Sequence, residues 1–248
     1  MKKLVASARR IGITLATLAL LHASARADQE LATDRPDFTE TSWTVGSRTL
    51  QLETGFTLAQ PADGSPHEVS APELLMRVGI ASRVEARLGF DRQWRDAAGL
   101  RNEGSLGAKI QLLDASSPLG LALIPAVAWP LWTDESDGFD DRARVAEVAL
   151  AWSGGLAEPW SIGGMVGSEL ASDPVHQATV SIGRALGEDM GTFFEWAVEF
   201  AEGEAGHLLH HGYTFGLGRD AQLDFHLGFG LTDPAPDFFF GMGLGLRR

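Results

Sequence analysis

The sequence contains no cysteine, which excludes disulfide bridges and thiolate sites. It also lacks a Gly-x-Ser-x-Gly nucleophile elbow, a His-Glu-x-x-His motif, a phosphate-binding loop and a dinucleotide-binding fingerprint. Enzyme classes that depend on these motifs are therefore excluded, and no cofactor is expected. No apolar run is long enough for a membrane-spanning helix. If the chain enters a membrane, it must do so as a closed β-barrel, in which every backbone donor pairs with a neighbouring strand.

Basic residues are scarce, and several of them belong to an export signal. Lys2, Lys3, Arg9 and Arg10 precede an apolar stretch at residues 11–21, and Ala25-Arg26-Ala27 forms a small-x-small cleavage site. We predict a signal peptide over residues 1–27. Five of the 20 basic residues and none of the 33 acidic ones lie in it, so the remaining chain carries 15 basic residues and a net charge of −18. This balance argues against nucleic acid as a partner.

The chain is organised around a predicted hairpin from Glu73 to Asp91, in which apolar and polar residues alternate. One face carries Leu74, Met76, Val78 and Ile80, and after a turn at Ala81-Ser82 it continues with Val84, Ala86, Leu88 and Phe90. The other face carries Glu73, Arg77, Gly79, Glu85, Arg87, Gly89 and Asp91, with Leu75 as the one apolar exception. Because successive side chains of a strand point to opposite faces, one face of this hairpin is apolar and the other bears charges of both signs.

The same alternation recurs to the C-terminus in segments of roughly ten residues, as expected of a transmembrane β-barrel. We predict an all-β fold, an antiparallel transmembrane β-barrel of about twelve strands that occupies residues 48–248. The expected strands are 48–58, 70–80, 83–91, 104–112, 119–130, 143–152, 159–169, 176–186, 191–200, 209–218, 221–231 and 236–246.

The polar face of such a barrel lines its lumen. The predicted lumen-lining residues are Glu53, Glu73, Arg77, Glu85, Arg87, Lys109, Glu147, Glu195, Glu199, Asp224 and His226. An unpaired charge in a narrow lumen is costly, so we expect these residues to form a cross-barrel network of both signs. Glycines fall mostly on the same face, where they leave space or let the wall bend. The lumen should therefore be narrow or partly plugged.

Residues 28–47, which we call the lead-in segment, do not alternate. The segment contains Asp34, Arg35, Pro36, Asp37 and Glu40. A segment with charges of both signs, stiffened by proline, can pair with a charged lumen. We expect it to fold into or beneath the periplasmic mouth of the barrel and restrict it as a plug. A solvated leader is the alternative.

A catalytic or metal site has weak support. His207, His210 and His211 form the one histidine cluster, but His210 and His211 point to opposite faces of an extended chain. We interpret the histidine cluster as part of a polar loop at the outer rim of the barrel, and we expect no metal site there. Glu195 and Glu199 share a face of one strand and could form a catalytic pair of carboxylates. We favour the interpretation that they are lumen charges balanced by Arg or Lys.

Several motifs together resemble a known family. They are Thr33 to Ser42 of the lead-in segment, Gln51-Leu52-Glu53, Pro72-Glu73-Leu74-Leu75 with Arg77, Val84-Glu85-Ala86-Arg87, Leu106-Gly107-Ala108-Lys109 and Ala235-Pro236-Asp237-Phe238. They resemble the bacterial outer-membrane "transporter" family associated with meta-pathway phenol degradation. The resemblance implies an outer-membrane barrel that passes small, often aromatic or apolar molecules. Members tend to end on an aromatic residue, whereas this chain ends Leu246-Arg247-Arg248, which bears on recognition by the barrel-insertion machinery.

The leading hypothesis is an outer-membrane channel for passive uptake or efflux of small solutes, with membrane lipid and the insertion machinery as partners. Two alternatives stay open. One is an outer-membrane hydrolase on a twelve-stranded barrel, and the other is a soluble periplasmic β-barrel or sandwich that binds apolar ligands. A soluble barrel would need polar residues on the face that is apolar here.

Overall fold

The computed structural model describes residues 31–248 apart from 63, 96–98, 114–116 and 134–143. The predicted signal peptide, residues 1–27, lies outside the described residues. Twelve strands follow in chain order: β1 (Leu50–Gln60), β2 (Glu68–Ala81), β3 (Val84–Arg95), β4 (Gly99–Gln111), β5 (Leu119–Thr133), β6 (Val145–Gly155), β7 (Trp160–Leu170), β8 (His176–Ala185), β9 (Met190–Ala201), β10 (Glu204–Gly216), β11 (Ala221–Gly230) and β12 (Phe238–Arg247). Among the described residues, no helix is long and apolar enough to cross a membrane.

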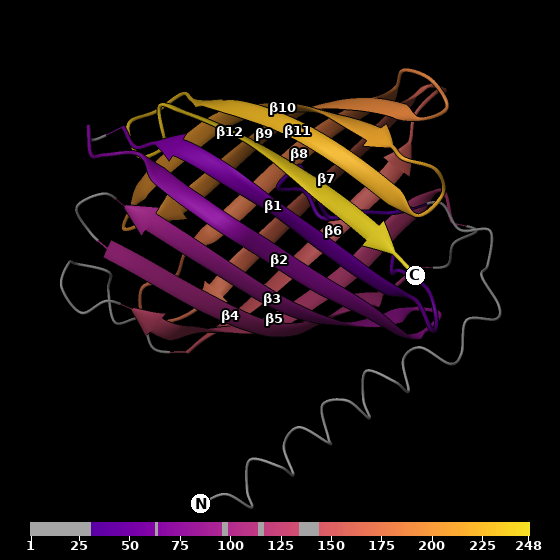
Figure 1. Cartoon of the computed structure of the whole chain (residues 1–248), viewed down its shortest axis with the longest axis horizontal. Helices are drawn as coiled ribbons and strands as arrows, with labels where there is room; N and C mark the ends of the chain where they lie inside the picture. Colours follow the sequence, from indigo (N-terminus) through magenta and orange to yellow (C-terminus); the bar gives the residue numbers. More distant parts are fainter. Residues whose placement is uncertain (1–30, 63, 96–98, 114–116, 134–143) are drawn as a thin grey trace, which may run out of the picture.

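The strands form one closed barrel in which each strand pairs with its neighbours in sequence, and β1 pairs with β12. Every pairing is antiparallel. Figure 1 shows the strands tilted across the barrel wall, with the C-terminus at the end where β1 begins. We call this the periplasmic end and the opposite one the outer end, as in barrels with short periplasmic turns. The predicted antiparallel barrel of about twelve strands is confirmed.

The two faces of the wall have the predicted chemistry. Exposed large apolar side chains such as Ile80, Leu88 and Leu106 cover the outside, whereas Arg77 and Lys109 are fully buried inside. The register explains this separation, because Arg77 pairs with Arg87 and Met76 with Leu88, so each face stays uniform across the β2–β3 hairpin. The apolar side chains thus face lipid and the charged ones face the lumen.

The predicted strands 83–91 and 104–112 are longer than expected, since β3 runs to Arg95 and β4 begins at Gly99. Two turns also differ from the prediction. The turn between β2 and β3 is Ser82-Arg83 instead of Ala81-Ser82, because a register shift between Gly79 and Ala81 adds a residue to β2. Residues 201–208 lie between two predicted strands, 191–200 and 209–218, but only Glu202-Gly203 form the turn, with φ of 54° and 86°. Positive φ at both residues is the geometry of a type I′ turn, whose twist matches that of a hairpin. The polar residues after this turn therefore belong to β10.

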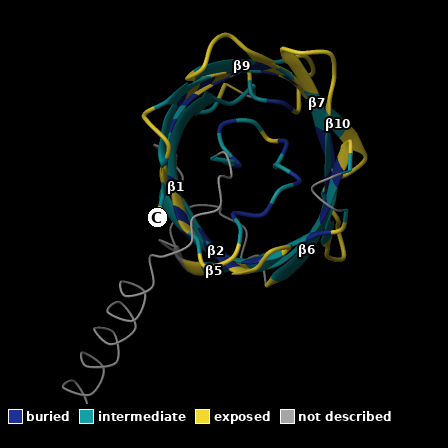
Figure 2. Ribbon diagram, turned by 90° about the vertical axis from the view of Figure 1, so that its right-hand side faces the viewer, coloured by how far each residue is buried: buried dark blue, intermediate teal, exposed yellow. Residues whose placement is uncertain are grey.

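Residues 31–47 of the lead-in segment lie inside the barrel. Figure 2, an end view, shows a stretch of chain winding across the interior of the ring of strands. Inward glycines make room for it. A Cβ at Gly243 or Gly55 would clash with the Arg35 guanidinium, and one at Gly79 would clash with the Gly46 carbonyl oxygen. The lumen is therefore shaped to hold residues 31–47.

Candidate functional site

Asp34 is the centre of an ionic cluster that binds the start of the lead-in segment to the wall. Its carboxylate lies 2.6 Å from Lys109 Nζ, 2.8 Å from Arg87 Nη1 and 3.2 Å from Arg77 Nη1. The three bases come from adjacent strands β2, β3 and β4, and their inward positions on paired strands bring them together. All four side chains are buried. The cluster replaces the water that these charges lose on burial.

The carboxylate of Glu53 on β1 holds the backbone of the same stretch. The amides of Asp34 and Arg35 both donate to Glu53 Oε2, at 2.9 and 3.1 Å. Arg77 Nη1 donates to the other oxygen, Oε1, at 3.0 Å. Each oxygen of this buried carboxylate thus accepts a hydrogen bond, and the donors to Oε2 both belong to the lead-in segment.

Arg35 reaches across to another part of the wall. Its guanidinium pairs with Glu73 on β2, lies 3.6 Å from the Asp224 carboxylate on β11 and donates to the Met242 carbonyl oxygen at 3.4 Å. The guanidinium therefore bridges strands on both sides of the β1–β12 closure.

The tip of the lead-in segment, Asp37 to Thr39, is bound by Glu195 on β9. The Phe38 amide donates to Oε2 at 2.9 Å, and the Thr39 amide and hydroxyl donate to Oε1 at 2.7 and 2.6 Å. Backbone and hydroxyl donors thus satisfy Glu195, and no Arg or Lys is needed. The expectation that Arg or Lys would balance this carboxylate is wrong for Glu195.

A histidine pair continues from Glu195. His210 Nδ1 lies 2.9 Å from Glu195 Oε2, and His210 Nε2 lies 3.0 Å from His226 Nδ1. The Phe38 ring packs on His210 with centroids 4.7 Å apart, and on Phe239 at 5.7 Å. The tip is therefore held by an aromatic contact as well as by hydrogen bonds.

The histidine cluster does not form the expected polar loop. His207, His210 and His211 all lie in β10, and His210 is buried in the lumen. The His211 ring stacks on Phe194, a residue of the lipid-facing side of the wall, with ring centroids 4.1 Å apart. Among the described residues, no group of three His, Cys, Asp or Glu side chains is placed to hold a metal ion. The Thr39 hydroxyl donates to Glu195, so this carboxylate binds the tip of the lead-in segment by a side chain as well as by backbone amides.

The return half of the segment descends along other strands. Arg87 Nη2 donates to the Glu40 carboxylate at 2.9 Å, and the hydroxyls of Ser42 and Ser153 on β6 hydrogen bond to each other. The Val45 amide donates to Glu85 Oε2 at 2.8 Å near the periplasmic end. The segment therefore rises from the periplasmic end to the tip at Glu195 and comes back.

The predicted lumen-lining residues all lie at inward positions of their strands: Glu53, Glu73, Arg77, Glu85, Arg87, Lys109, Glu147, Glu195, Glu199, Asp224 and His226. Charges of both signs do pair, but the network differs from the expected one. Its hub is Asp34 of the lead-in segment, and the wall residues Arg77 and Glu85, which pair at 2.8 Å, come from neighbouring strands. Asp34 of the segment thus serves as the shared partner of three wall bases, Arg77, Arg87 and Lys109.

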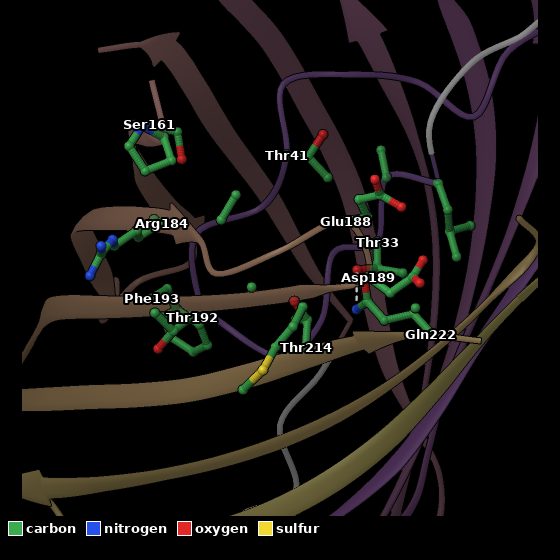
Figure 3. A pocket seen from close by; sticks show the side chains of 18 of the residues that line it. Thr33, Thr41, Ser161, Arg184, Glu188, Asp189, Thr192, Phe193, Thr214 and Gln222 are labelled. Carbon is green, nitrogen blue, oxygen red and sulfur yellow. Dashed lines mark hydrogen bonds between the residues drawn. The ribbon is translucent and has the colours of Figure 1, made fainter. Parts of the chain in front are cut away.

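Cavities remain on both sides of the lead-in segment. The larger, of about 940 Å³, opens at the periplasmic end and is lined by Thr33, Thr41, Ser161, Phe193 and Thr214 among others. Figure 3 shows these side chains around the cavity, with the hydrogen bond from Gln222 Nε2 to Thr33 Oγ1, 2.8 Å long. A second cavity of about 250 Å³, which we call the outer cavity, lies between Glu40 and strands β2 to β9.

Sequence reasoning missed an apolar part of the lumen. Ile124, Ala151 and Met165 form a buried cluster with Ala149 beside it, on β5, β6 and β7. A signal was present, because the inward positions of β5 are Gly120, Ala122, Ile124, Ala126 and Ala128, whereas the neighbouring strand β4 places Glu103, Ser105, Lys109 and Gln111 inward. The lumen therefore has a charged side and an apolar side.

Two carboxyl groups of the lead-in segment have shifted pKa values of opposite sign. Burial alone would raise the pKa of Asp34, but Arg77, Lys109 and Arg87 hold that pKa well below its usual range. Asp37 is half-buried, and loss of hydration together with the nearby Glu195 carboxylate raises its pKa well above the usual value. Asp34 thus favours the docked segment as an anion, whereas ionised Asp37 opposes docking.

A closed antiparallel barrel with an apolar outside and a charged lumen defines the chain as a transmembrane β-barrel of the outer-membrane type. A soluble β-barrel or sandwich, the third hypothesis, is excluded by this arrangement of faces. The chain belongs to the family described as "Putative MetA-pathway of phenol degradation", whose model matches residues 33–247. The predicted resemblance is confirmed. A search of curated proteins found no match.

Solved structures share the fold. The chain is similar to the COG4313 outer membrane channel from Pseudomonas putida F1, with 14% identity, a TM-score of 0.61 and coverage of 87% of this chain and 100% of that one. It is also similar to the KdgM porin, with 8% identity, a TM-score of 0.59 and coverage of 79% and 98%. The NanC porin matches with 8% identity, a TM-score of 0.57 and coverage of 79% and 98%. At these identities the likeness shows the fold.

Proposed function

We propose that this barrel is an outer-membrane channel for passive passage of small solutes, and that the lead-in segment is a displaceable plug. The observation that carries the proposal is the segment at residues 31–47, which separates a cavity of about 940 Å³ from the outer cavity of about 250 Å³. Its described contacts with the wall are hydrogen bonds, ion pairs and ring contacts, so the segment can leave without opening the barrel. The proposal includes no catalytic step.

Small aromatic or apolar compounds fit this channel best. The family description refers to phenol degradation, and the barrels of similar fold are channels or porins. One of them, the KdgM porin, is described in complex with oligogalacturonate, a solute of another chemical class. The apolar side of the lumen, with Ile124 and Met165, favours less polar solutes in this chain.

We further propose that residues 1–27 direct export and are removed, and that the barrel-insertion machinery assembles the rest. The signal-like pattern and the outer-membrane fold support this proposal.

An engineered disulfide tests the plug directly. The hydroxyl groups of Ser42 and Ser153 are in contact, and the native chain has no cysteine that could interfere. The double variant Ser42→Cys/Ser153→Cys should therefore form a bond between the lead-in segment and β6 under oxidising conditions. Conductance in planar bilayers would be recorded before and after addition of a reductant.

We expect the oxidised double variant to stay closed and the reduced one to conduct as the native chain does. The single variants Ser42→Cys and Ser153→Cys are matched controls and should not respond to the reductant. If the oxidised variant conducts as well as the reduced one while the disulfide is present, solutes do not need the segment to move, and the plug role is wrong. If no form conducts, including one lacking residues 31–44, the channel function itself is contradicted.

A further inference from the structure

The outer cavity combines an apolar floor with an acidic rim. The floor is formed by Leu75 on β2, Ile124 and Ala126 on β5, Ala149 on β6 and Met165 on β7. The inward register of the adjacent strands β5, β6 and β7 brings four of these residues together, and Leu75 lines the same cavity from β2. An apolar surface inside a water-filled barrel gains free energy when a ligand covers it.

The cavity is large enough for a single aromatic ring. Its volume is about 250 Å³, whereas an apolar cavity of about 150 Å³ already binds benzene. The remaining space accommodates one or two small substituents on the ring. Polymeric or multi-ring solutes would not fit without movement of the lead-in segment.

The acidic rim, formed by Glu147, Glu169 and Glu199, restricts the charge of the ligand. Glu147 and Glu169 are direct cross-strand partners, and Glu199 faces Gln177 on the next pair of strands. The one lining base, Arg87, is already paired with Asp34 at 2.8 Å and with Glu40 at 2.7 Å. Two like charges placed opposite each other on a sheet destabilise it, and a hydrogen-bond donor or a cation between them offsets this cost. A carboxylate in the same place would add a further like charge.

We propose that the outer cavity is a binding subsite for single-ring aromatic molecules that carry a hydrogen-bond donor or a positive charge, and that it rejects aromatic carboxylates. The ring lies on Leu75, Ile124 and Met165, and its hydroxyl or ammonium group faces Glu147 and Glu169. This inference rests on the proposed channel function for its physiological meaning, but the binding itself does not require conduction.

Equilibrium binding to the folded, detergent-solubilised full chain tests the subsite. Phenol, benzylamine and benzoate would be titrated calorimetrically into the native chain. We expect phenol and benzylamine to bind, and benzoate to bind at least about tenfold more weakly, because like charges in a partly desolvated site repel strongly.

Two variants with matched controls separate the subsite from uptake by detergent. Ala126→Phe fills the outer cavity and should abolish phenol binding, whereas Ala185→Phe, the same change in the periplasmic cavity, should not. Glu147→Gln/Glu169→Gln should raise benzoate affinity about tenfold or more, whereas Glu158→Gln/Glu188→Gln at the periplasmic cavity should leave it unchanged. A gain of binding cannot come from misfolding.

The proposal is overturned if benzoate binds the native chain as tightly as phenol, if Ala126→Phe binds phenol unchanged, or if neutralising the rim does not help benzoate. Absence of any binding to the native chain also overturns it. None of these results bears on the conductance of the disulfide variant, so failure of the subsite and failure of the channel function remain distinguishable.

Discussion

At the scale of single residues, Asp34 decides where the lead-in segment lies. Three bases surround its carboxylate, and its own amide donates to Glu53. Removing one partner from a buried charge cluster costs much more than the cluster contributes as a whole, because the remaining charges lose both water and partner. Asp34 is for this reason the most sensitive position of the segment.

Asp34→Asn should release the segment. We expect a loss of about 3–5 kcal/mol of docking free energy and a higher open probability in planar bilayers, with normal heat-modifiable migration of the barrel. Asp233→Asn, in an exposed outer loop, is the control and should conduct as the native chain does. A closed channel with Asn at position 34 would show that the cluster does not hold the plug.

The same residue predicts a pH dependence. The pKa of Asp34 is lower when the segment is docked than when it is free, so its contribution to docking is complete above the ordinary aspartate pKa of about 3.9. That contribution declines as the pH falls below this value. Conductance of the native chain should therefore rise on acidification below about pH 4, and Asp34→Asn should lose this part of the response.

Ionisation of Asp37 has the opposite effect on docking to ionisation of Asp34. Its pKa is raised in the docked segment, so its ionised form weakens docking at neutral pH and protonation relieves that penalty. Asp37→Asn should therefore lower the open probability at pH 7, which single-channel recording would measure against Asp233→Asn. An unchanged or higher open probability would indicate that Asp37 lies in water and not beside Glu195.

At the scale of strands, the alternating pattern sets which face of the wall a side chain occupies, and its position along the strand sets its depth in the membrane. Leu106 lies at the middle of β4 on the lipid-facing side of the wall, where its side chain is 57% exposed. Leu170 ends β7 on the same face and is 62% exposed. The two leucines therefore differ in depth and not in the face they occupy.

Leu106→Arg should destabilise the barrel by about 2–4 kcal/mol, and Leu170→Arg by about 0–1 kcal/mol, because a charge costs most at the bilayer midplane. Unfolding by denaturant in lipid vesicles, followed by tryptophan fluorescence, would give both values. Equal costs for the two variants would contradict the depth that the strand positions assign to them.

At the scale of the whole molecule, the lumen beyond the plug is acidic. The cavities there are lined by Glu73, Asp91, Glu103, Glu147, Glu169 and Glu199. The lining bases Arg35, Arg87 and Arg101 are each paired with a carboxylate. A pore ringed by carboxylates concentrates cations.

The open channel should therefore prefer cations. In a potassium chloride gradient the reversal potential should have the sign set by potassium, and Glu147→Gln/Glu169→Gln should move it toward zero. The pair Glu158→Gln/Glu188→Gln, at the periplasmic cavity, should change it less. A reversal potential set by chloride in the native chain would contradict this prediction.

The sequence by itself determined the barrel. Alternation has a period of two, so a strand such as β12 has Phe240, Met242 and Leu244 on one face of the sheet and Gly241, Gly243 and Gly245 on the other. Strand number and the inward set, from Glu53 to His226, follow from this local rule. The turn at Glu202-Gly203 escaped prediction because polar residues occur both in loops and on lumen-facing strand positions.

Only the tertiary structure decided how the lumen is filled. Closure of β1 on β12 brings Gly55 beside Gly243, where Arg35 fits. Pairing of β2, β3 and β4 gathers Arg77, Arg87 and Lys109, where Asp34 fits. These contacts join residues far apart in sequence, and no local pattern encodes them. The outer cavity also depends on the curvature of the closed barrel, because Leu75 on β2 lines it together with Ile124 and Met165 from strands that do not pair with β2.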